Sequence, residues 1–398
     1  MRRSPSLAVV STILIVAAPL GAQTPLKTLA KADVEYSEPF TTITGVRELR
    51  DGRIIVADAR EKTVQLIDLK AGRATKLGRE GSGPGEYALP MRLLGLPGDT
   101  SAVYDPLNRR YLLIGPDGKV GAFASYEPAE NTSGRIRITI PRAIDDRGRL
   151  YSVGPSFNVN PTGPSSSADS APILRLDRAT KKTDTVAFIH TPAATITTSG
   201  GGNGQNVSVR AGGGNPFAAT DDWAVLPDGR VAVLRVKDYH VDWYLPNGQK
   251  ASGPAIAYEK IKVTDEDKKQ YRERAASGAA GTAIVMSQRV GPGGTSSSAS
   301  VGAPTNIQLP EPTDWPDVKP PFTSNAAVGA PNGQMWVLRT RSAKDKIPTY
   351  DVFDASGKVV SRVALPANTR LLGFGIGTVY LARSDEDDLQ YLQRYRLP

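Results

Sequence analysis

A turn that contains glycine, followed by a strand of alternating apolar residues, recurs six times along the chain. Glycine after aspartate or asparagine suits a tight hairpin, because the central residues of such a turn tolerate positive φ. A second turn follows most first turns at a similar distance, as Gly72 does 20 residues after Gly52. Each repeat therefore predicts two hairpins, or four antiparallel strands. The six first-turn glycines are Gly52, Gly98, Gly148, Gly229, Gly333 and Gly377.

The spacing of these glycines predicts the number of units. Successive intervals are 46, 50, 81, 104 and 44 residues, and a four-stranded propeller blade takes about 40–50 residues. The two long intervals contain stretches rich in Gly, Ser and Pro, which we interpret as mobile loop insertions that leave one face. A seventh blade inside the longer interval is the alternative. We predict an all-β, six-bladed β-propeller over residues 24–398, with insertions at about 158–172, 191–216 and 259–320.

The two ends of the repeat array predict how the ring closes. After Gly377 the chain has only the strands "TVYLAR" and "LQYLQRYRL", one strand short of a blade. The segment "DVEYSEPF", residues 33–40, precedes the first unit and belongs to no hairpin. If this segment forms the outer strand of the last blade, it closes the ring and covers the open edge of that blade. One short helix is predicted in the largest insertion, where Thr264 caps "DEDKKQYRERAAS".

The N-terminus predicts export. Arg2 and Arg3 precede an apolar run and a small-residue exit, the pattern of a secretory signal peptide over residues 1–23. The run is shorter than the ~20 apolar residues that span a bilayer, and no later segment is apolar enough, so we expect a periplasmic or extracellular chain without a membrane span. An N-terminal anchor is the alternative. With 0 Cys, stability has to come from the core.

The charge pattern restricts the class of partner. The formal net charge of +9 is spread along the chain without runs of lysine and arginine. This distribution argues against nucleic-acid binding. We expect a monomer whose partner is an unidentified protein, peptide or glycan.

The glycine-rich stretch "KLGREGSGPGEY" resembles a phosphate-binding loop only in composition. A Walker loop needs Lys-Ser/Thr and a helix after its last glycine, whereas Gly85 precedes Glu86-Tyr87 and Pro84 lacks an N–H donor. We interpret the stretch as a connection between blades. "GREGSGPGEYALP" resembles the recurrent motif of secreted bacterial six-bladed propellers related to the NHL-repeat and TolB-like propellers. The match is close over residues 42–120, and it implies the fold but no catalytic residues.

Candidate catalytic residues are few. The 2 His of the chain, His190 and His240, are interpreted as a solvated loop residue and a packed strand residue. Six-bladed propellers include calcium-dependent lactonases and quinone-dependent sugar dehydrogenases, so a hydrolase, lactonase or dehydrogenase with a metal site at the channel mouth is the alternative function. Its calcium ligands would be Asp58, Asp222 and Asn325. The sequence favours a binding or scaffold module, which needs no cofactor, over an enzyme.

Arginines recur at equivalent positions of the repeat. Three lie at the predicted ends of second strands and three at the starts of first strands, which predicts that both sets share one face. Because arginine favours carboxylate and phosphate partners, we predict a site for an acidic ligand at the channel mouth. In the alternative, these arginines pair with acids such as Asp58, Asp105 and Asp385 and tie the blades together. The six are Arg92, Arg142, Arg235, Arg339, Arg370 and Arg383.

Overall fold

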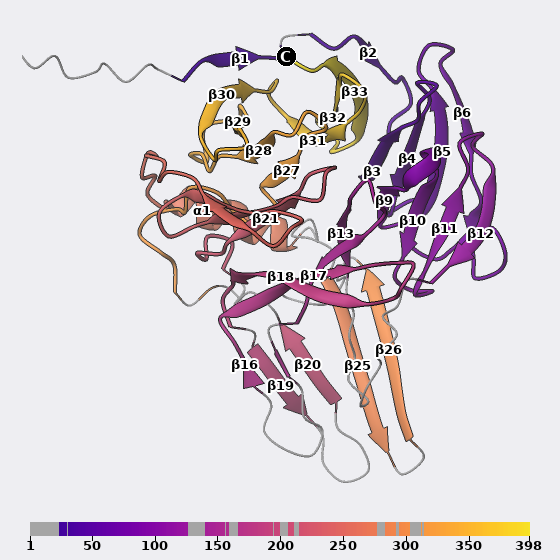
Figure 1. Ribbon diagram of the computed structural model, residues 1–398, viewed down its shortest axis with the longest axis horizontal. Coiled ribbons are helices and arrows are strands. Elements are labelled where there is room, and N and C mark those ends of the chain that lie inside the picture. The colour runs from indigo at the N-terminus through magenta and orange to yellow at the C-terminus, as the bar shows by residue number, and fades with distance from the viewer. Residues whose placement is uncertain are drawn as a thin grey trace, which may run out of the picture.

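The computed structural model forms six blades that follow one another along the chain, each with four antiparallel strands (Figure 1). It describes residues 24–29, 31–125, 140–155, 157–158, 166–193, 195–199, 206–210, 215–276, 283–291, 294–302, 312 and 314–398. The predicted signal peptide lies outside the described residues.

Five blades are built from consecutive hairpins, as the repeat predicts. Blade 1 consists of β3 (Ile43–Glu48), β4 (Ile54–Asp58), β5 (Thr63–Asp68) and β6 (Arg73–Lys76). Blade 2 consists of β9 (Arg92–Gly95), β10 (Ser101–Asp105), β11 (Arg110–Ile114) and β12 (Val120–Ala124). Blade 3 consists of β13 (Pro141–Ile144), β14 (Leu150–Val153), β17 (Ser170–Leu176) and β18 (Thr183–His190). Blade 4 consists of β21 (Asp222–Val225), β22 (Val231–Arg235), β23 (His240–Tyr244) and β24 (Lys250–Ser252). Blade 5 contains β27 (Ala327–Gly329), β28 (Met335–Leu338), β29 (Thr349–Phe353) and β30 (Val359–Ala364).

Blade 6 takes one strand from the other end of the chain. Its strands β31 (Thr369–Phe374), β32 (Thr378–Ser384) and β33 (Gln390–Arg396) are completed by β2 (Val34–Glu35), which pairs antiparallel with β33. The backbone of Phe40 exchanges two further hydrogen bonds with Gln390, and the side chains of Tyr36 and Phe40 are buried. The predicted closure of the ring by an N-terminal strand is confirmed.

The hydrophobic core lies between the blades. Six clusters of buried side chains each join two neighbouring blades, including blade 6 to blade 1, so the packing runs around a closed ring. Trp243, for example, packs between blades 4 and 5, and Trp336 packs between blades 5 and 6. The first strands of successive blades contact one another, β3 with β9 and β31, β13 with β9 and β21, and β21 with β27. These contacts place β3, β9, β13, β21, β27 and β31 around the axis of the propeller.

Blade 5 carries a fifth strand that the repeat does not predict. Strand β1 (Leu26–Thr28) pairs in parallel with β30, and the carbonyl oxygen of Pro25 accepts a hydrogen bond from Arg362. Leu29, just after β1, is buried in the cluster between blades 5 and 6. The N-terminal segment therefore covers the outer edges of two successive blades.

The glycine-rich stretch is a connection between blades 1 and 2, as predicted. It forms a short parallel pair, β7 (Arg79–Glu80) with β8 (Glu86–Tyr87). The Glu86 carboxylate accepts hydrogen bonds from the Gly83 N–H at 2.7 Å and from Arg79 at 2.6 Å, so it occupies donors that a phosphate would need. A 3₁₀ turn, η1 (Pro97–Asp99), lies between β9 and β10.

The predicted helix is present as α1 (Asp265–Ala276). Thr264 caps it, since the Thr264 hydroxyl accepts from the Asp267 N–H and the Asp267 carboxylate accepts from the Thr264 N–H. Asp267 also forms a buried ion pair with Lys319 at 2.6 Å, which fixes the helix to the returning chain. Within the described residues, no helix combines the length and apolar character needed to cross a membrane.

The insertions contain strands, which differs from the expectation of mobile loops. β19 (Thr195–Ser199), β20 (Asn206–Arg210), β25 (Ala283–Gly291) and β26 (Gly294–Gly302) form a separate four-stranded sheet. This sheet joins two insertions, because β20 and β25 pair through Asn206 and Arg289. The small hairpin of β15 (Phe157–Asn158) and β16 (Ser166–Ser167) lies in the insertion predicted at about 158–172. Figure 1 shows β16, β19, β20, β25 and β26 projecting on the same side of the propeller.

Candidate functional site

Three of the six predicted arginines lie at one end of the ring of first strands. Arg92, Arg142 and Arg370 stand at or near the starts of the first strands β9, β13 and β31. The other three stand at the ends of, or just after, the second strands, which run antiparallel to the first. Arg235, Arg339 and Arg383 therefore share the same face but lie one strand further from the axis.

Arg142 is held in a clamp across three blades. Its guanidinium donates to both carboxylate oxygens of Asp222, with Nη1 to Oδ1 at 2.5 Å, and to the carbonyl oxygen of Ala327 at 3.0 Å. The Ala327 N–H in turn donates to Asp222 at 2.8 Å. Because the Asp222 side chain is only 3% exposed, the two opposite charges are matched at a largely buried position between the blades.

Arg92 and Arg370 differ from Arg142 in their partners. Arg92 donates to the carbonyl oxygen of Arg142 at 3.1 Å, and Arg370 donates to the carbonyl oxygen of Ile43 at 2.9 Å and to the side chain of Gln390. Neither forms an ion pair with a carboxylate in the part of the chain that the structure describes. Desolvation lowers the pKa of both guanidinium groups, and the nearby Arg142 charge adds to the effect at Arg92.

Arg339 and Arg383 pair with acids. Arg383 forms two hydrogen bonds with Glu35 of β2, at 2.9 and 3.0 Å, which raise its pKa against the opposing effect of desolvation. Arg339 lies 3.7 Å from the buried carboxylate of Asp351. Both arginines thus connect neighbouring chain segments on the outer part of the face.

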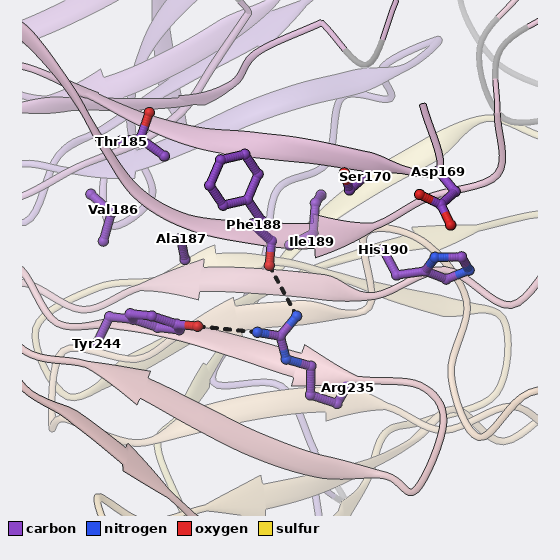
Figure 2. Close-up of a pocket in the computed structure, with 10 residues that line it drawn as sticks. All are labelled: Asp169, Ser170, Thr185, Val186, Ala187, Phe188, Ile189, His190, Arg235 and Tyr244. Atoms are coloured by element: carbon purple, nitrogen blue, oxygen red, sulfur yellow. Dashed lines mark hydrogen bonds between the residues drawn. The ribbon is translucent and has the colours of Figure 1, made fainter. Parts of the chain in front are cut away.

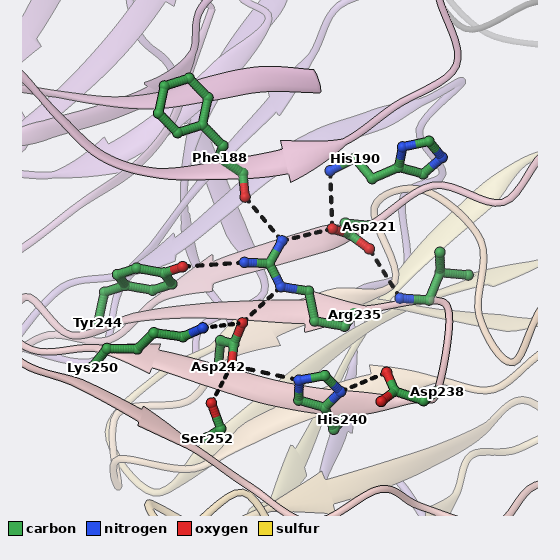
Figure 3. Close-up of polar contacts among 11 residues, drawn as sticks. Phe188, His190, Asp221, Arg235, Asp238, His240, Asp242, Tyr244, Lys250 and Ser252 are labelled. Carbon is green, nitrogen blue, oxygen red and sulfur yellow. Dashed lines mark hydrogen bonds and ion pairs between the residues drawn. The ribbon is translucent and has the colours of Figure 1, made fainter. Parts of the chain in front are cut away.

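Arg235 is the centre of a polar network between blades 3 and 4, shown in Figure 3. Its guanidinium contacts Asp221 and Asp242, each at 2.8 Å, and donates to the Phe188 carbonyl oxygen at 2.9 Å and the Tyr244 hydroxyl at 3.1 Å. Asp221 also accepts from the backbone N–H groups of His190 and Val236.

Asp242 is the most strongly perturbed acid of this network. Burial raises its pKa, but hydrogen bonds from Ser252, Arg235 and Lys250 outweigh that effect and lower the pKa to about 2. His240 lies beside it, with Nε2 3.5 Å from Asp242 and Nδ1 2.7 Å from Asp238. The carboxylate is therefore charged at neutral pH and surrounded by donors.

A cleft of about 560 Å³ opens beside this network, as Figure 2 shows. One wall is β18, and the opposite wall carries Arg235 and Tyr244 of blade 4. Its volume falls within the range of ~300–1,000 Å³ that is usual for ligand sites. The lining residues are Asp169, Ser170, Thr185, Val186, Ala187, Phe188, Ile189, His190, Arg235 and Tyr244.

The residues named for a calcium site belong to three different blades. Asp58 closes β4 of blade 1 and accepts from four backbone N–H groups. Asp222 belongs to the clamp in blade 4, and Asn325 is an exposed residue just before β27. Among the described residues, no group of three or more His, Asp or Glu side chains could hold a metal ion.

The acids that pair with the arginines are not those named from the sequence. Asp105 accepts from backbone N–H groups and from Asn108, and Asp385 accepts from backbone N–H groups of its own turn. The sequence reasoning also missed that His190 and His240 both border the Arg235 network. The only sequence signal for this network is the density of charged and aromatic residues in "RVKDYHVDWY", which contains Arg235, Asp242 and Tyr244.

Comparisons with known proteins extend over nearly the whole chain at low identity. A calcium-binding regucalcin from Agrobacterium tumefaciens shares 11% identity and covers 94% of this chain and 97% of its own, with a TM-score of 0.39. Virginiamycin B lyase from Staphylococcus aureus shares 10%, with coverage of 92% and 99% and a TM-score of 0.39. The PQQ-bound aldose sugar dehydrogenase from Streptomyces coelicolor shares 14%, with coverage of 92% and 97% and a TM-score of 0.39.

These similar structures are six-bladed β-propeller proteins. Identities and TM-scores this low assign no activity or ligand to this chain. No family model and no curated protein sequence matches it, so the resemblance to NHL-repeat and TolB-like propellers stays a prediction.

Proposed function

We propose that this protein is an exported binding module, and that the end of the channel where the first strands begin takes an acidic ligand. The proposal rests on Arg92, which is partly buried, and Arg370, which is exposed, because the hydrogen-bond partners of both guanidinium groups among the described residues are uncharged oxygens. At the partly buried Arg92, a cation without a counter-charge is costly unless an anion matches it. A carboxylate or phosphate group on the ligand would supply that charge, and the guanidinium fork can bind either group with two hydrogen bonds.

Two of the other arginines already have carboxylate partners, which leaves fewer arginines to bind a ligand. Arg142 is neutralised by Asp222, while Arg383 is neutralised by Glu35. An acidic ligand would therefore be recognised by Arg92 and Arg370, on the two sides of β3, with Arg142 and Arg383 holding the surrounding blades. The strands of the insertions project beside the propeller and would limit which ligands reach this face.

The test is a binding titration with defined probes at low and high salt. Acidic and neutral oligosaccharides of equal length, and acidic and neutral peptides of equal length, are titrated into the protein and into an Arg92→Gln/Arg370→Gln variant. The matched control is Arg383→Gln, which removes an arginine that already has a carboxylate partner. We expect the double variant to lose at least about tenfold in affinity for the acidic probe, whereas the control keeps most of it.

Thermal unfolding separates ligand binding from a structural role. Because Arg92 and Arg370 are cations without a counter-charge, their replacement by neutral glutamine should leave the melting temperature unchanged or higher. The proposal is wrong if no acidic probe binds the unmodified protein, or if the double variant binds it equally well.

A further inference from the structure

The cleft between blades 3 and 4 runs along the outer edge of a strand. Six consecutive residues of β18, from Thr185 to His190, line it (Figure 2). Side chains of a strand alternate between its two faces, so a cleft over one face would be lined by every second residue. The unbroken run shows that the cleft follows the backbone edge of β18.

At Phe188 this edge presents its backbone groups to the cleft. Phe188 lies opposite Pro172 on β17, and the Pro172 carbonyl bonds to Gly154 on the other side of that strand. Phe188 and Pro172 therefore form a non-hydrogen-bonded pair of the antiparallel ladder. The N–H and the C=O of Phe188 both point away from β17. The carbonyl oxygen accepts from Arg235 at 2.9 Å, while the N–H faces the cleft with no acceptor in the described part of the chain.

The outer edges of blades 5 and 6 show how this chain covers such strands. β1 pairs with the edge of β30, and β2 pairs with the edge of β33. Among the other blades, the outer strands β6, β12 and β24 have four, five and three residues, whereas β18 has eight. At the His190 end the backbone N–H and C=O of β18 already bond to Asp221, so the open part of this edge lies at Phe188 and toward Thr183. An open edge is a template for another extended segment.

The side chains around this edge indicate the composition of such a segment. Phe188 is 57% exposed, and Tyr244 lies across the cleft from β18, so an apolar or aromatic side chain would fit between them. The charge of Arg235 is already matched by Asp221 and Asp242. Asp169 also lines the cleft, and its exposed carboxylate forms no ion pair among the described residues. Its negative charge favours a basic residue in the bound segment.

We infer that the cleft binds an extended peptide segment of a partner protein, which adds to β18 as a further strand. A carbonyl group of the peptide accepts from the Phe188 N–H. An apolar side chain of the peptide packs on Phe188 and Tyr244, and a lysine or arginine contacts Asp169. This site is separate from Arg92 and Arg370, and it selects a basic, extended peptide rather than an anion.

The probe is an acetylated and amidated peptide of alternating valine and threonine, with a central phenylalanine and a lysine at each end. Either direction of the peptide then brings one lysine to Asp169. Two control peptides carry glutamate in place of lysine, or N-methyl groups on alternate residues, which prevent strand pairing. Binding is measured by titration calorimetry, and hydrogen exchange reports on the Phe188 amide.

Variants of Phe188 separate the side chain from the backbone. Phe188→Ala removes only the ring and should weaken binding by about tenfold. Phe188→Pro also removes the outward N–H, which an edge strand tolerates, and should abolish binding. Asp169→Asn should reduce the preference for lysine over glutamate, and Arg92→Gln/Arg370→Gln should have no effect.

The expected result is binding of the lysine peptide, none of the N-methylated peptide, and slower exchange at Phe188 when the peptide is bound. The inference is overturned if the lysine peptide does not bind, if both Phe188 variants bind it as the unmodified protein does, or if Asp169→Asn leaves the preference intact. It is also overturned if the unmodified protein is a dimer that Phe188→Pro converts to monomers, since a second copy would then occupy the edge.

Discussion

Asp222 on blade 4 binds Arg142 on blade 3 through both of its oxygens, although 80 positions separate them in the sequence. The same carboxylate accepts the Ala327 N–H of blade 5. One side chain thus connects the first strands of three successive blades.

Removing this carboxylate should destabilise the propeller strongly. Asp222→Ala leaves Arg142 partly buried without its partner, and breaking a buried ion pair costs about 3–5 kcal/mol. Asp228→Ala is the control, because Asp228 pairs with Arg230 in an exposed turn where the loss is within about 1 kcal/mol. Chemical denaturation compares the two free energies of unfolding, and equal losses would contradict the clamp.

The two N-terminal strands should contribute unequally to folding. Deleting residues 24–31 removes β1, which adds to an otherwise complete blade 5, and the buried Leu29. Deleting residues 24–41 also removes β2 and the buried Tyr36 and Phe40, and leaves the edge of β33 open. We expect a lowered but cooperative thermal transition for the first deletion and none for the second. An unchanged transition in the longer deletion would refute closure of the ring by β2.

Acid should weaken the network around Asp242. Its pKa of about 2 in the folded protein lies below the ordinary value of 3.8, so its contribution is complete above pH ~4 and is lost as the pH falls toward 2. We expect the free energy of unfolding to fall by roughly 1–2 kcal/mol from this group across that window. Asp242→Asn should be less stable at neutral pH and show a smaller fall. An identical pH profile for the variant would exclude this contribution.

The connection between blades 1 and 2 should depend on Gly78. Its φ is +66°, and an added Cβ would lie 2.4 Å from the Gly85 carbonyl oxygen. Gly72 is a matched control, with φ of +63° and no atom within 4 Å of an added Cβ. Gly72→Ala should cost about 1–2 kcal/mol from backbone conformation alone, and Gly78→Ala clearly more. Equal losses in denaturant titrations would show that the close approach has no cost.

Much of the fold could be predicted because the sequence features that specify it lie within a few residues of one another. Turn glycines and period-two alternation specify hairpins, and the missing outer strand of the last unit indicated that Val34 and its neighbours complete it. β1 could not be predicted in the same way, because "LKT" is three exposed residues whose pairing depends on a distant strand. The strands of the insertions were missed because glycine and serine dominate those segments and obscure the alternation in "TITTS" and "NVSVR".

The candidate site was less predictable because charge pairing is not local. The repeat correctly placed Arg92 and Arg370 at one end of the first strands, but it could not distinguish them from Arg142. That distinction depends on Asp222, which approaches Arg142 only when blades 3 and 4 pack together. The cleft beside β18 leaves no signal in the sequence, since it results from the spacing of two blades.

β2 is among the first strands to be synthesised, but it pairs with β33, which is the last. The backbone N–H of Ile43, in the first strand of blade 1, donates to the side-chain oxygen of Gln390, 347 positions later. Until that residue has left the ribosome, β2 has no strand to pair with, and the first blade lacks one of its two neighbours. The ring therefore cannot close through the pairing of β2 with β33 until the last strands of the chain have been synthesised.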